Sequence, residues 1–551
     1  MINLKKLILK YKYNFLLIIL LIIIISLINT FLPYIIKTTI SLAENTYSFN
    51  DMQIKLFSLI IIYLIITLVC GIFEYLKTFL LSKNTQSLIY DIRKETYNRI
   101  MSFNMDTFSN MHIATLVTRM TSDISNIGEF VGKSLPMFIS SGIFLLTIII
   151  VICFINIYFA FVMIICSILL VFTILKIGKK MAYYKKIEIN TNEKINNFFS
   201  ETFSSIKTLH IFNIQKEREK ILDKYNLDEL NSSRKYFDSQ SLLTPVKTTT
   251  RYFIIFIILY MCIQNKIANV DIGIIYLVIS YLDKFFEPLG NMLYHYEDLQ
   301  KGKISIKRID ELLGNDNNIE NIYKGEKAEK LYGNIKFTNV NFSYIKGKKV
   351  LENLNFSINR GEKIALIGKT GSGKTTIINL ILGFYKIDSG NIMFDDKNID
   401  DLSLESIRKN ISFIQQNPYV FEDTIKKNII VNNENDISDE RIIEILKITG
   451  LYNKVSTFEN GIYQKINNKS LSKGEIQLLA FARAIAKETS IYIFDEPTSN
   501  VDTESEKNLK KIINKLSKDC TVIIIAHKSS TIENVDRIFE VVNKKINVKS
   551  N

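Results

Sequence analysis

The stretch Gly368-Lys369-Thr370-Gly371-Ser372-Gly373-Lys374-Thr375 decides the fold of the second half of this chain. It has the Gly-x-x-x-x-Gly-Lys-Thr spacing of a phosphate-binding loop. The apolar run 363–367 before it predicts a buried strand, and the segment 376–382 after it predicts a helix. Glycines let successive backbone N–H groups face a phosphate, and the helix start adds the positive end of its dipole. The sequence therefore predicts a nucleoside triphosphate site.

The side chains and backbone of this loop have expected roles in holding the triphosphate. The Lys374 ammonium is expected to reach the β- and γ-phosphates, and the Thr375 hydroxyl is expected to ligate Mg²⁺. The expected nucleotide contacts from this region are Gly368, Thr370, Gly371, Ser372, Gly373, Lys374, Thr375 and Thr376.

A second motif, Ile491-Tyr492-Ile493-Phe494-Asp495-Glu496, reads as an apolar strand that ends in two carboxylates. Buried strands often end in acidic residues, so the pattern alone is weak. Downstream of a phosphate loop, it indicates the metal-binding strand of a nucleotide hydrolase. Asp495 is expected near the Mg²⁺, and Glu496 is expected to polarise an attacking water.

The hydrophobic content is uneven along the 551 residues. Hydrophobic residues make up 47% of the chain, and nearly all long apolar runs lie before residue 290. A bilayer crossing takes about 20 helical residues, and six segments reach that length. They are residues 14–36, 56–78, 134–155, 157–176, 245–264 and 271–290. The sequence predicts a multidomain membrane protein whose N-terminal domain is all-α, with six transmembrane helices.

The pattern changes after the last span. Residues 1–311 are expected to form the transmembrane domain, and residues 312–332 a polar linker. In residues 333–551, short apolar strands alternate with helix-like segments. This alternation predicts an α/β P-loop ATPase domain with a largely parallel sheet.

The formal net charge of +14 is concentrated beside the spans. Residues 79–133 and 177–244 are rich in Lys and Arg, whereas 39–54 contains neither. The positive-inside rule then places both termini and the ATPase domain in the cytoplasm, at the cell membrane. A nucleic-acid partner is not expected, because the aromatic–basic interleaving of an RNA-binding sheet is missing from the sequence.

The two charged stretches are expected to extend the spans into the cytoplasm as long helices. Each carries an aromatic patch, at 103–111 and at 198–212. An amphipathic tip of this kind suits docking to a second domain, and an ordinary solvated loop is the alternative interpretation.

The segment Leu471-Ser472-Lys473-Gly474-Glu475 lies between the two nucleotide motifs. With these motifs and the six spans, the chain resembles the ATP-binding cassette (ABC) transporter family, and specifically its exporter-type half-transporters. The segment is similar to the family signature Leu-Ser-Gly-Gly-Gln. The resemblance covers essentially the whole chain, and it implies ATP and Mg²⁺ as ligands.

The resemblance implies further site residues. Tyr344 matches the aromatic residue that stacks on adenine, and Gln416 matches the glutamine that senses Mg²⁺ and the membrane domain. Asp502 falls in the D-loop, and His527 matches the switch histidine at the γ-phosphate. The metal site is then expected from Thr375, Gln416 and Asp495, and catalysis from Glu496, His527 and Lys374.

The resemblance also implies a mechanism. Two cassettes close head to tail, and each ATP lies between one phosphate loop and the partner's signature, where Ser472 and the Gly474 N–H contact the γ-phosphate. Hydrolysis separates the cassettes. Helix tips that dock near the Gln416 loop convert the closure of the two cassettes into alternating access. The implied function is ATP-driven export or flipping of a peptide, drug or lipid. The alternative is a nucleotide-gated or regulatory membrane protein on the same scaffold.

Two residues depart from the family signature. Lys473 and Glu475 replace a glycine and a glutamine, while Glu496 is intact. This combination resembles one half of a heterodimeric exporter, so we expect a second half-transporter with a regular signature. A homodimer that tolerates both replacements is the alternative, because Ser472 and Gly474 are present.

Overall fold

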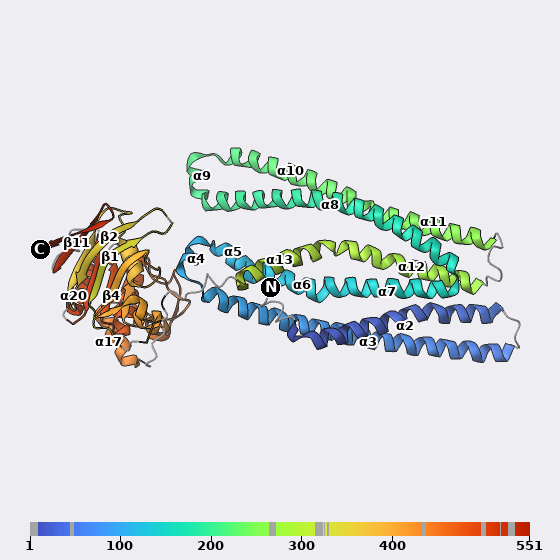
Figure 1. The fold of residues 1–551 in the computed structure, drawn as a ribbon, viewed down its shortest axis with the longest axis horizontal. Coiled ribbons are helices and arrows are strands. Elements are labelled where there is room, and N and C mark those ends of the chain that lie inside the picture. The colour runs from blue at the N-terminus through green and yellow to red at the C-terminus, as the bar shows by residue number, and fades with distance from the viewer. Residues whose placement is uncertain are drawn as a thin grey trace. The chain divides into compact units, whose positions relative to one another are not determined.

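The computed structural model describes residues 9–44, 49–263, 272–314, 323, 325–327, 330–345, 347–431, 437–497, 503–517, 519–526 and 535–550. The chain divides into two compact units, each of which is discontinuous in sequence (Figure 1). The helical unit contains Met1–Met101 and Ile113–Asp316, and the sheet unit contains Ser102–His112 and Asn317–Asn551.

Long helices that run alongside one another build the helical unit (Figure 1). They cover the six predicted spans apart from three end residues: residue 134 belongs to the preceding π-helical turn, and residues 264 and 271 lie outside the described residues. The membrane-length helices are α2 Lys12–Glu44, α3 Phe49–Met101, α7 Leu135–Ile155, α8 Ile157–Ser204, α11 Leu243–Ile263 and α12 Ile272–Tyr294.

Helix α12 differs from the other predicted spans in its charge. Among the described residues, five stretches are long and apolar enough to cross a bilayer, and α12 is not one of them. Its apolar run is interrupted by Asp283, Lys284 and Glu287. Asp283 forms an ion pair with Arg251 of α11 at 2.5 Å. Opposite charges at membrane depth offset one another's desolvation when they pair in this way.

The opposite face of α12 belongs to the core of the helical unit. Tyr281 is completely buried there, and its hydroxyl donates to the Thr30 carbonyl of α2 at 2.6 Å. One turn further on, the Lys284 ammonium donates to the Asn29 carbonyl at 2.8 Å. These two bonds tie α12 to α2, and both use carbonyls of the α2 backbone.

The predicted cytoplasmic extensions are helical. Helices α8 and α10 lie side by side, and α9 connects their ends (Figure 1). The remaining helices before the sheet are α4 Met105–Asn110, α5 Ile113–Thr118, η1 Arg119–Asp123, α6 Ile124–Glu129, η2 Phe130–Ser134, α9 Ile206–Phe212, α10 Gln215–Ser241 and α13 Tyr296–Gly314. The elements η1 and η2 are single π-helical turns.

The sheet unit contains a six-stranded sheet in the order β12-β11-β3-β10-β9-β6. All its described pairs are parallel except β11–β12, which agrees with the predicted parallel core. A second, antiparallel sheet has the order β2-β1-β4-β5. The strands are β1 Ile335–Phe342, β2 Leu351–Ile358, β3 Lys363–Ile367, β4 Ser389–Phe394, β5 Lys397–Asn398, β6 Ile411–Ile414, β7 Asp423–Thr424, β8 Lys465–Ile466, β9 Ile491–Asp495, β10 Thr521–Ile525, β11 Arg537–Val542 and β12 Lys545–Ser550.

Two apolar cores cover the faces of the parallel sheet. Strand β10 is buried at every position, as a central parallel strand covered on both faces requires. On one face, Phe481 of α19 stacks on Phe494 of β9 with ring centroids 5.2 Å apart. The helices of this unit are α14 Lys374–Ile381, η4 Ile399–Asp401, α15 Leu404–Lys409, α16 Ile425–Ile430, α17 Asp439–Thr449, α18 Tyr452–Val455, η5 Gly461–Tyr463, α19 Lys473–Lys487 and α20 Thr503–Leu516.

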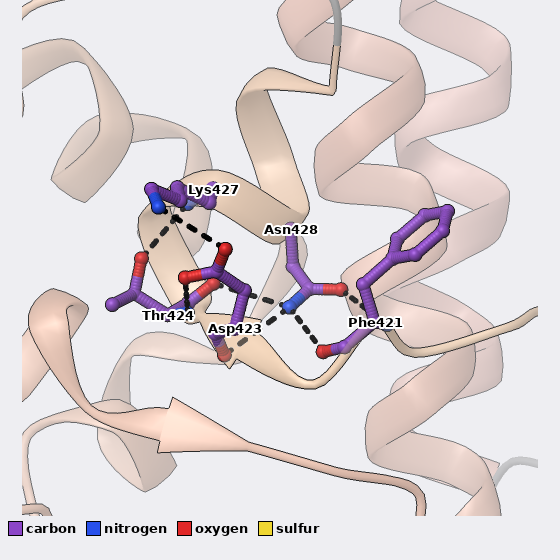
Figure 2. A network of polar contacts seen from close by, with 5 residues as sticks. All are labelled: Phe421, Asp423, Thr424, Lys427 and Asn428. Carbon is purple, nitrogen blue, oxygen red and sulfur yellow. Dashed lines mark hydrogen bonds and ion pairs between the residues drawn. The ribbon is translucent and has the colours of Figure 1, made fainter. Parts of the chain in front are cut away.

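A buried asparagine fixes the turn before α16. The Asn428 amide donates to the carbonyls of Phe421 and Thr424 at 2.9 and 3.1 Å, and its oxygen accepts the Phe421 N–H at 2.9 Å. Thr424 caps α16, and Lys427 pairs with Asp423 at 3.1 Å (Figure 2). One fully buried side chain therefore holds the segment that follows Gln416.

We predict that Asn428→Ala destabilises the sheet unit by about 2 kcal/mol, because it leaves buried backbone groups without partners. Thermal unfolding of the full chain in detergent measures the effect. Asn453→Ala changes an exposed asparagine of α18 and serves as the matched control. Equal melting temperatures for the two variants would contradict the prediction.

Candidate nucleotide-binding site

The parallel register brings the two nucleotide motifs to one edge of the sheet. Ile525 of β10 pairs with Leu366 of β3 on one side and with Asp495 of β9 on the other. The phosphate loop that follows β3 and the carboxylates at the end of β9 therefore flank the same strand end. This is the carboxyl edge of a parallel sheet, where ligands bind in open α/β folds.

The glycines of the loop have backbone conformations that side chains disfavour. Gly368 has φ +146°, and a Cβ there would lie 2.6 Å from the Val541 carbonyl oxygen. Gly373 has φ +110° immediately before α14. In the described part of the chain, the Ser372 hydroxyl is one of the buried polar atoms without a hydrogen-bond partner. A tight loop at a helix start with an unsatisfied polar atom fits a bound phosphate.

Lys374 lies over the loop that precedes it. Its ammonium donates to the carbonyls of Gly368 and Lys369 at 2.8 and 3.1 Å. Burial lowers the pKa of Lys374, although the carboxylates of Glu496 and Asp495 act to raise it. The cation thus lies within electrostatic reach of both acidic residues that the sequence assigned to the site.

Two predicted site residues from different segments contact each other directly. Gln416 follows β6, and its amide donates to a carboxylate oxygen of Glu496 at 2.8 Å. Glu496 has a left-handed backbone with φ 47°, and its N–H donates to the Ile525 carbonyl at 3.1 Å. A non-glycine residue in this conformation is held there by its surroundings and is typical of functional sites.

Tyr344 belongs to an aromatic cluster beside α14. Its hydroxyl donates to the buried Thr376 hydroxyl at 3.2 Å, and its ring meets Tyr385 edge to face at 5.0 Å. Asn379 also donates to the Tyr344 hydroxyl, at 3.4 Å. Tyr385 and Asn379 were not predicted from the sequence, because neither lies in a recognisable motif.

The first aromatic patch, 103–111, lies within the segment Ser102–His112, which groups with the sheet unit. Two side chains of this segment, Ser109 and Asp106, act on the Tyr385 hydroxyl. Burial raises the pKa of Tyr385, a hydrogen bond with Ser109 lowers it, and the charge of Asp106 raises it. These contacts connect the patch to Tyr385, the aromatic neighbour of Tyr344.

The signature segment begins helix α19. Ser472 is the N-cap, and its hydroxyl accepts the Glu475 N–H at 3.2 Å. The Glu475 carboxylate accepts the Ser472 N–H at 2.7 Å, which completes a capping box. Gly474 lies in the first turn, and Lys454 is 3.8 Å from Glu475. The glutamate at this position therefore stabilises the helix start.

The remaining predicted site residues include Thr375, Thr370, Asp502 and His527. Thr375 is exposed in the first turn of α14, and Thr370 is exposed in the loop. Asp502 and His527 lie outside the described residues. Within the described ranges, His, Cys, Asp and Glu side chains form no group of three or more that could hold a metal. A hard cation that takes most of its ligands from phosphate and water fits the hydroxyl and carboxylate oxygens that are present.

Comparisons with known proteins agree with this geometry. Residues 15–289 match the ABC transporter transmembrane region, and residues 351–499 match the ABC transporter domain. A probable multidrug resistance ABC transporter ATP-binding/permease protein of Bacillus subtilis is 30% identical over 479 residues, which span 85% of this chain and 70% of that protein. The ATP-dependent lipid A-core flippase of Pasteurella multocida is 28% identical over 481 residues, which span 86% of this chain and 82% of the flippase.

The fold is also that of a solved exporter. A bacterial Atm1-family ABC exporter with ATP bound matches with a TM-score of 0.80 at 19% identity, over 100% of this chain and 95% of the other. The shared fold joins a helical membrane region to an ATP-binding domain. The chain therefore belongs to the ABC transporter family, as an exporter-type half-transporter that couples ATP hydrolysis to export.

Proposed function

We propose that this exporter uses ATP sites shared with a second half-transporter to move a hydrophobic or amphipathic solute across the cytoplasmic membrane by alternating access. Both termini and the ATPase domain lie in the cytoplasm, as the loop charges indicate. The observation that carries the proposal is the 2.8 Å contact between Gln416 and Glu496, within electrostatic reach of Lys374. This contact joins Glu496, the expected catalytic carboxylate, to Gln416, which lies in the segment expected to sense the membrane domain. Lys374 relates both residues to the phosphate loop.

Each residue of the site has its own role in ATP binding and hydrolysis. Glu496 holds and polarises the attacking water, and Lys374 and His527 stabilise charge on the transferring phosphoryl group. Tyr344 stacks on adenine, and the loop from Gly368 to Thr376 binds the phosphates. Mg²⁺ would be held by Thr375, Asp495 and Gln416, and it would neutralise charge between the β- and γ-phosphates.

The signature of each chain completes the site of the other. Ser472 and the Gly474 N–H are placed by the capping box at the start of α19. The Asp502 segment contributes to the same interface. ATP then holds two cassettes together, and its hydrolysis releases them, so that the helix tips alternate between two positions.

A heterodimer is favoured by the charge at this signature. The Glu475 carboxylate bonds to the Ser472 N–H, so it lies beside the position expected for the partner's γ-phosphate. Like charges repel, and the cations of Lys454, at 3.8 Å from Glu475, and of Lys473 offset part of the repulsion. We therefore assign to this chain an intact hydrolytic site, completed by a partner with a regular signature.

The solute class is supported by the membrane core. A pocket of about 670 Å³ in the helical unit is lined by apolar and aromatic side chains. Phe31 and Tyr34 of α2 stack at its wall with ring centroids 5.9 Å apart. Such a lining suits a peptide, a lipophilic drug or a lipid acyl chain, and the names of the relatives include multidrug resistance and lipid A-core flipping.

We predict that Glu496→Gln lowers Mg-ATPase turnover at least ~100-fold while ATP binding is retained, because the variant loses the group that polarises water. Phosphate release by the chain in lipid, together with equilibrium ATP binding, separates the two effects. Glu459→Gln changes an exposed glutamate and should leave turnover unchanged. Undiminished turnover in Glu496→Gln would refute the assignment of the catalytic residue.

We predict that Glu475→Gln raises the Mg-ATPase of the purified chain alone about threefold or more, because the negative charge beside the signature serine is removed. Glu459→Gln makes the same charge change at an exposed position away from the helix start. Equal and robust turnover of the wild-type chain and the Glu475→Gln variant would favour a homodimer.

We predict that Phe31→Ala raises the half-maximal concentration for solute-stimulated ATPase about tenfold, because an aromatic ring that would be buried by the bound solute is lost from the pocket wall. A lipophilic dye, a phospholipid and a hydrophobic peptide are the probes. Phe57→Ala removes an exposed phenylalanine of α3 that does not line the pocket. Equal responses of the two variants would exclude this pocket from solute binding.

A further inference from the structure

The apolar pocket of the helical unit has a cation near each of its two ends. The described residues that line it come from α2, α3, α7 and α12 and include no acidic or basic side chain. Its volume of about 670 Å³ lies in the range of roughly 300–1,000 Å³ that is usual for small-molecule sites. A charge carried by a bound solute must therefore be met at the ends of the pocket, where Lys284 and Lys37 lie.

Lys284 lies at the end that faces the cytoplasm in the proposed orientation. On α12 it follows Tyr281, which lines the pocket, by one helical turn. Its ammonium donates to the Asn29 carbonyl of α2 at 2.8 Å. Both sequence neighbours of Asn29, Ile28 and Thr30, line the pocket. About 9 Å of helix separates Lys284 from the predicted end of its span, so the cation lies at membrane depth.

The carboxylates around Lys284 do not balance its charge. Asp283 is paired with Arg251 of α11 at 2.5 Å. Glu287 lies one turn after Asp283 and so shares the face of α12 that is turned toward α11. On α3, the exposed Glu74 is followed three positions later by a lysine, which offsets its charge. The Asn29 carbonyl satisfies a hydrogen bond of the ammonium but does not neutralise it, and an unneutralised cation at this depth is costly.

The opposite end of the pocket carries the second cation. The half-buried Lys37 of α2 places its ammonium 5.5 Å from the centroid of the Tyr34 ring. Tyr34 lines the pocket and stacks on Phe31. A cation–π contact attracts the ammonium to the ring but leaves its full charge in place. About 12 Å of helix separates Lys37 from Asn29, so the apolar lining lies between two positive ends.

These charges distinguish between classes of solute. A neutral solute gains nothing from the two cations, and a cationic solute is repelled by both. An acid head on an apolar chain buries the chain in the pocket and pairs its charge with an ammonium. We infer that the pocket takes anionic amphiphiles, in which one carboxylate or phosphate group is attached to a long apolar chain, and that Lys284 and Lys37 select for the acid head. The inference rests on the proposed function and narrows its class of solute.

The test measures binding to the full chain in phosphatidylcholine nanodiscs without nucleotide, by displacement of a neutral fluorescent alkyl probe. Hexadecyl phosphate, hexadecanoate or both should bind at least about tenfold tighter than hexadecanol, because only the acids form charge-assisted hydrogen bonds with the lysines. The tighter of the two acids identifies the head group. Hexadecylamine has the same chain with a positive charge and should bind more weakly than the alcohol.

Variants of the two lysines assign the preference to these residues. Lys284→Gln and Lys37→Gln should each reduce the preference for acid over alcohol, and together they should remove it. Binding of hexadecanol should stay unchanged, which shows that the variant is folded. Lys284→Arg keeps the charge and should keep the preference. Lys176→Gln removes an exposed cation of α8 outside the pocket and is the matched control.

Three results would overturn the inference. They are equal binding of acids and alcohol by the wild-type chain, tighter binding of the amine, and a preference for acid that survives the double glutamine variant. Because no nucleotide is present, none of these results bears on the assignment of Glu496. Stimulation of ATPase by a neutral solute would still support the proposed export, so failure of the inference and failure of the proposed function are distinguishable.

Discussion

The parallel pairing of β10 with both β3 and β9 is the constraint on which the nucleotide site depends. Ile525 pairs with Leu366 and with Asp495, so one strand sets the spacing between the phosphate loop and the acidic pair. Burial of all five β10 residues makes a shift in register costly, because a slip would disrupt close packing against the apolar cores on both faces of the sheet. The positions of the phosphate loop and of the proposed catalytic carboxylate are therefore determined by the hydrophobic core.

Local sequence patterns were sufficient to predict most of this architecture. The run Lys363–Ile367 forms β3 at the predicted residues, and Ile491–Asp495 forms β9. Both predictions succeeded because a buried parallel strand is a short apolar run with a sharp end. The predicted spans correspond to helices for a similar reason, since about 20 apolar residues have few alternatives to a membrane helix.

Contacts between distant segments could not be predicted in this way. Tyr385 meets Tyr344, which lies 41 positions earlier in the chain, although Tyr385 itself belongs to no recognisable motif. Asn428 organises a turn whose residues look like an ordinary polar loop. The antiparallel sheet was also not predicted, because strands such as β1 alternate polar and apolar residues around a bulge. Glu475 stands in a Ser-x-x-Glu capping-box pattern that the sequence shows directly, whereas the family signature has a glutamine at this position.

The grouping of Ser102–His112 with the sheet unit has a consequence for how the chain can be divided. A fragment that begins at the predicted boundary, residue 333, would contain every nucleotide motif but would lack Asp106 and Ser109. The Tyr385 hydroxyl would then meet water instead of these side chains. A fragment studied alone therefore has an aromatic cluster beside α14 that lacks these two neighbours of Tyr385.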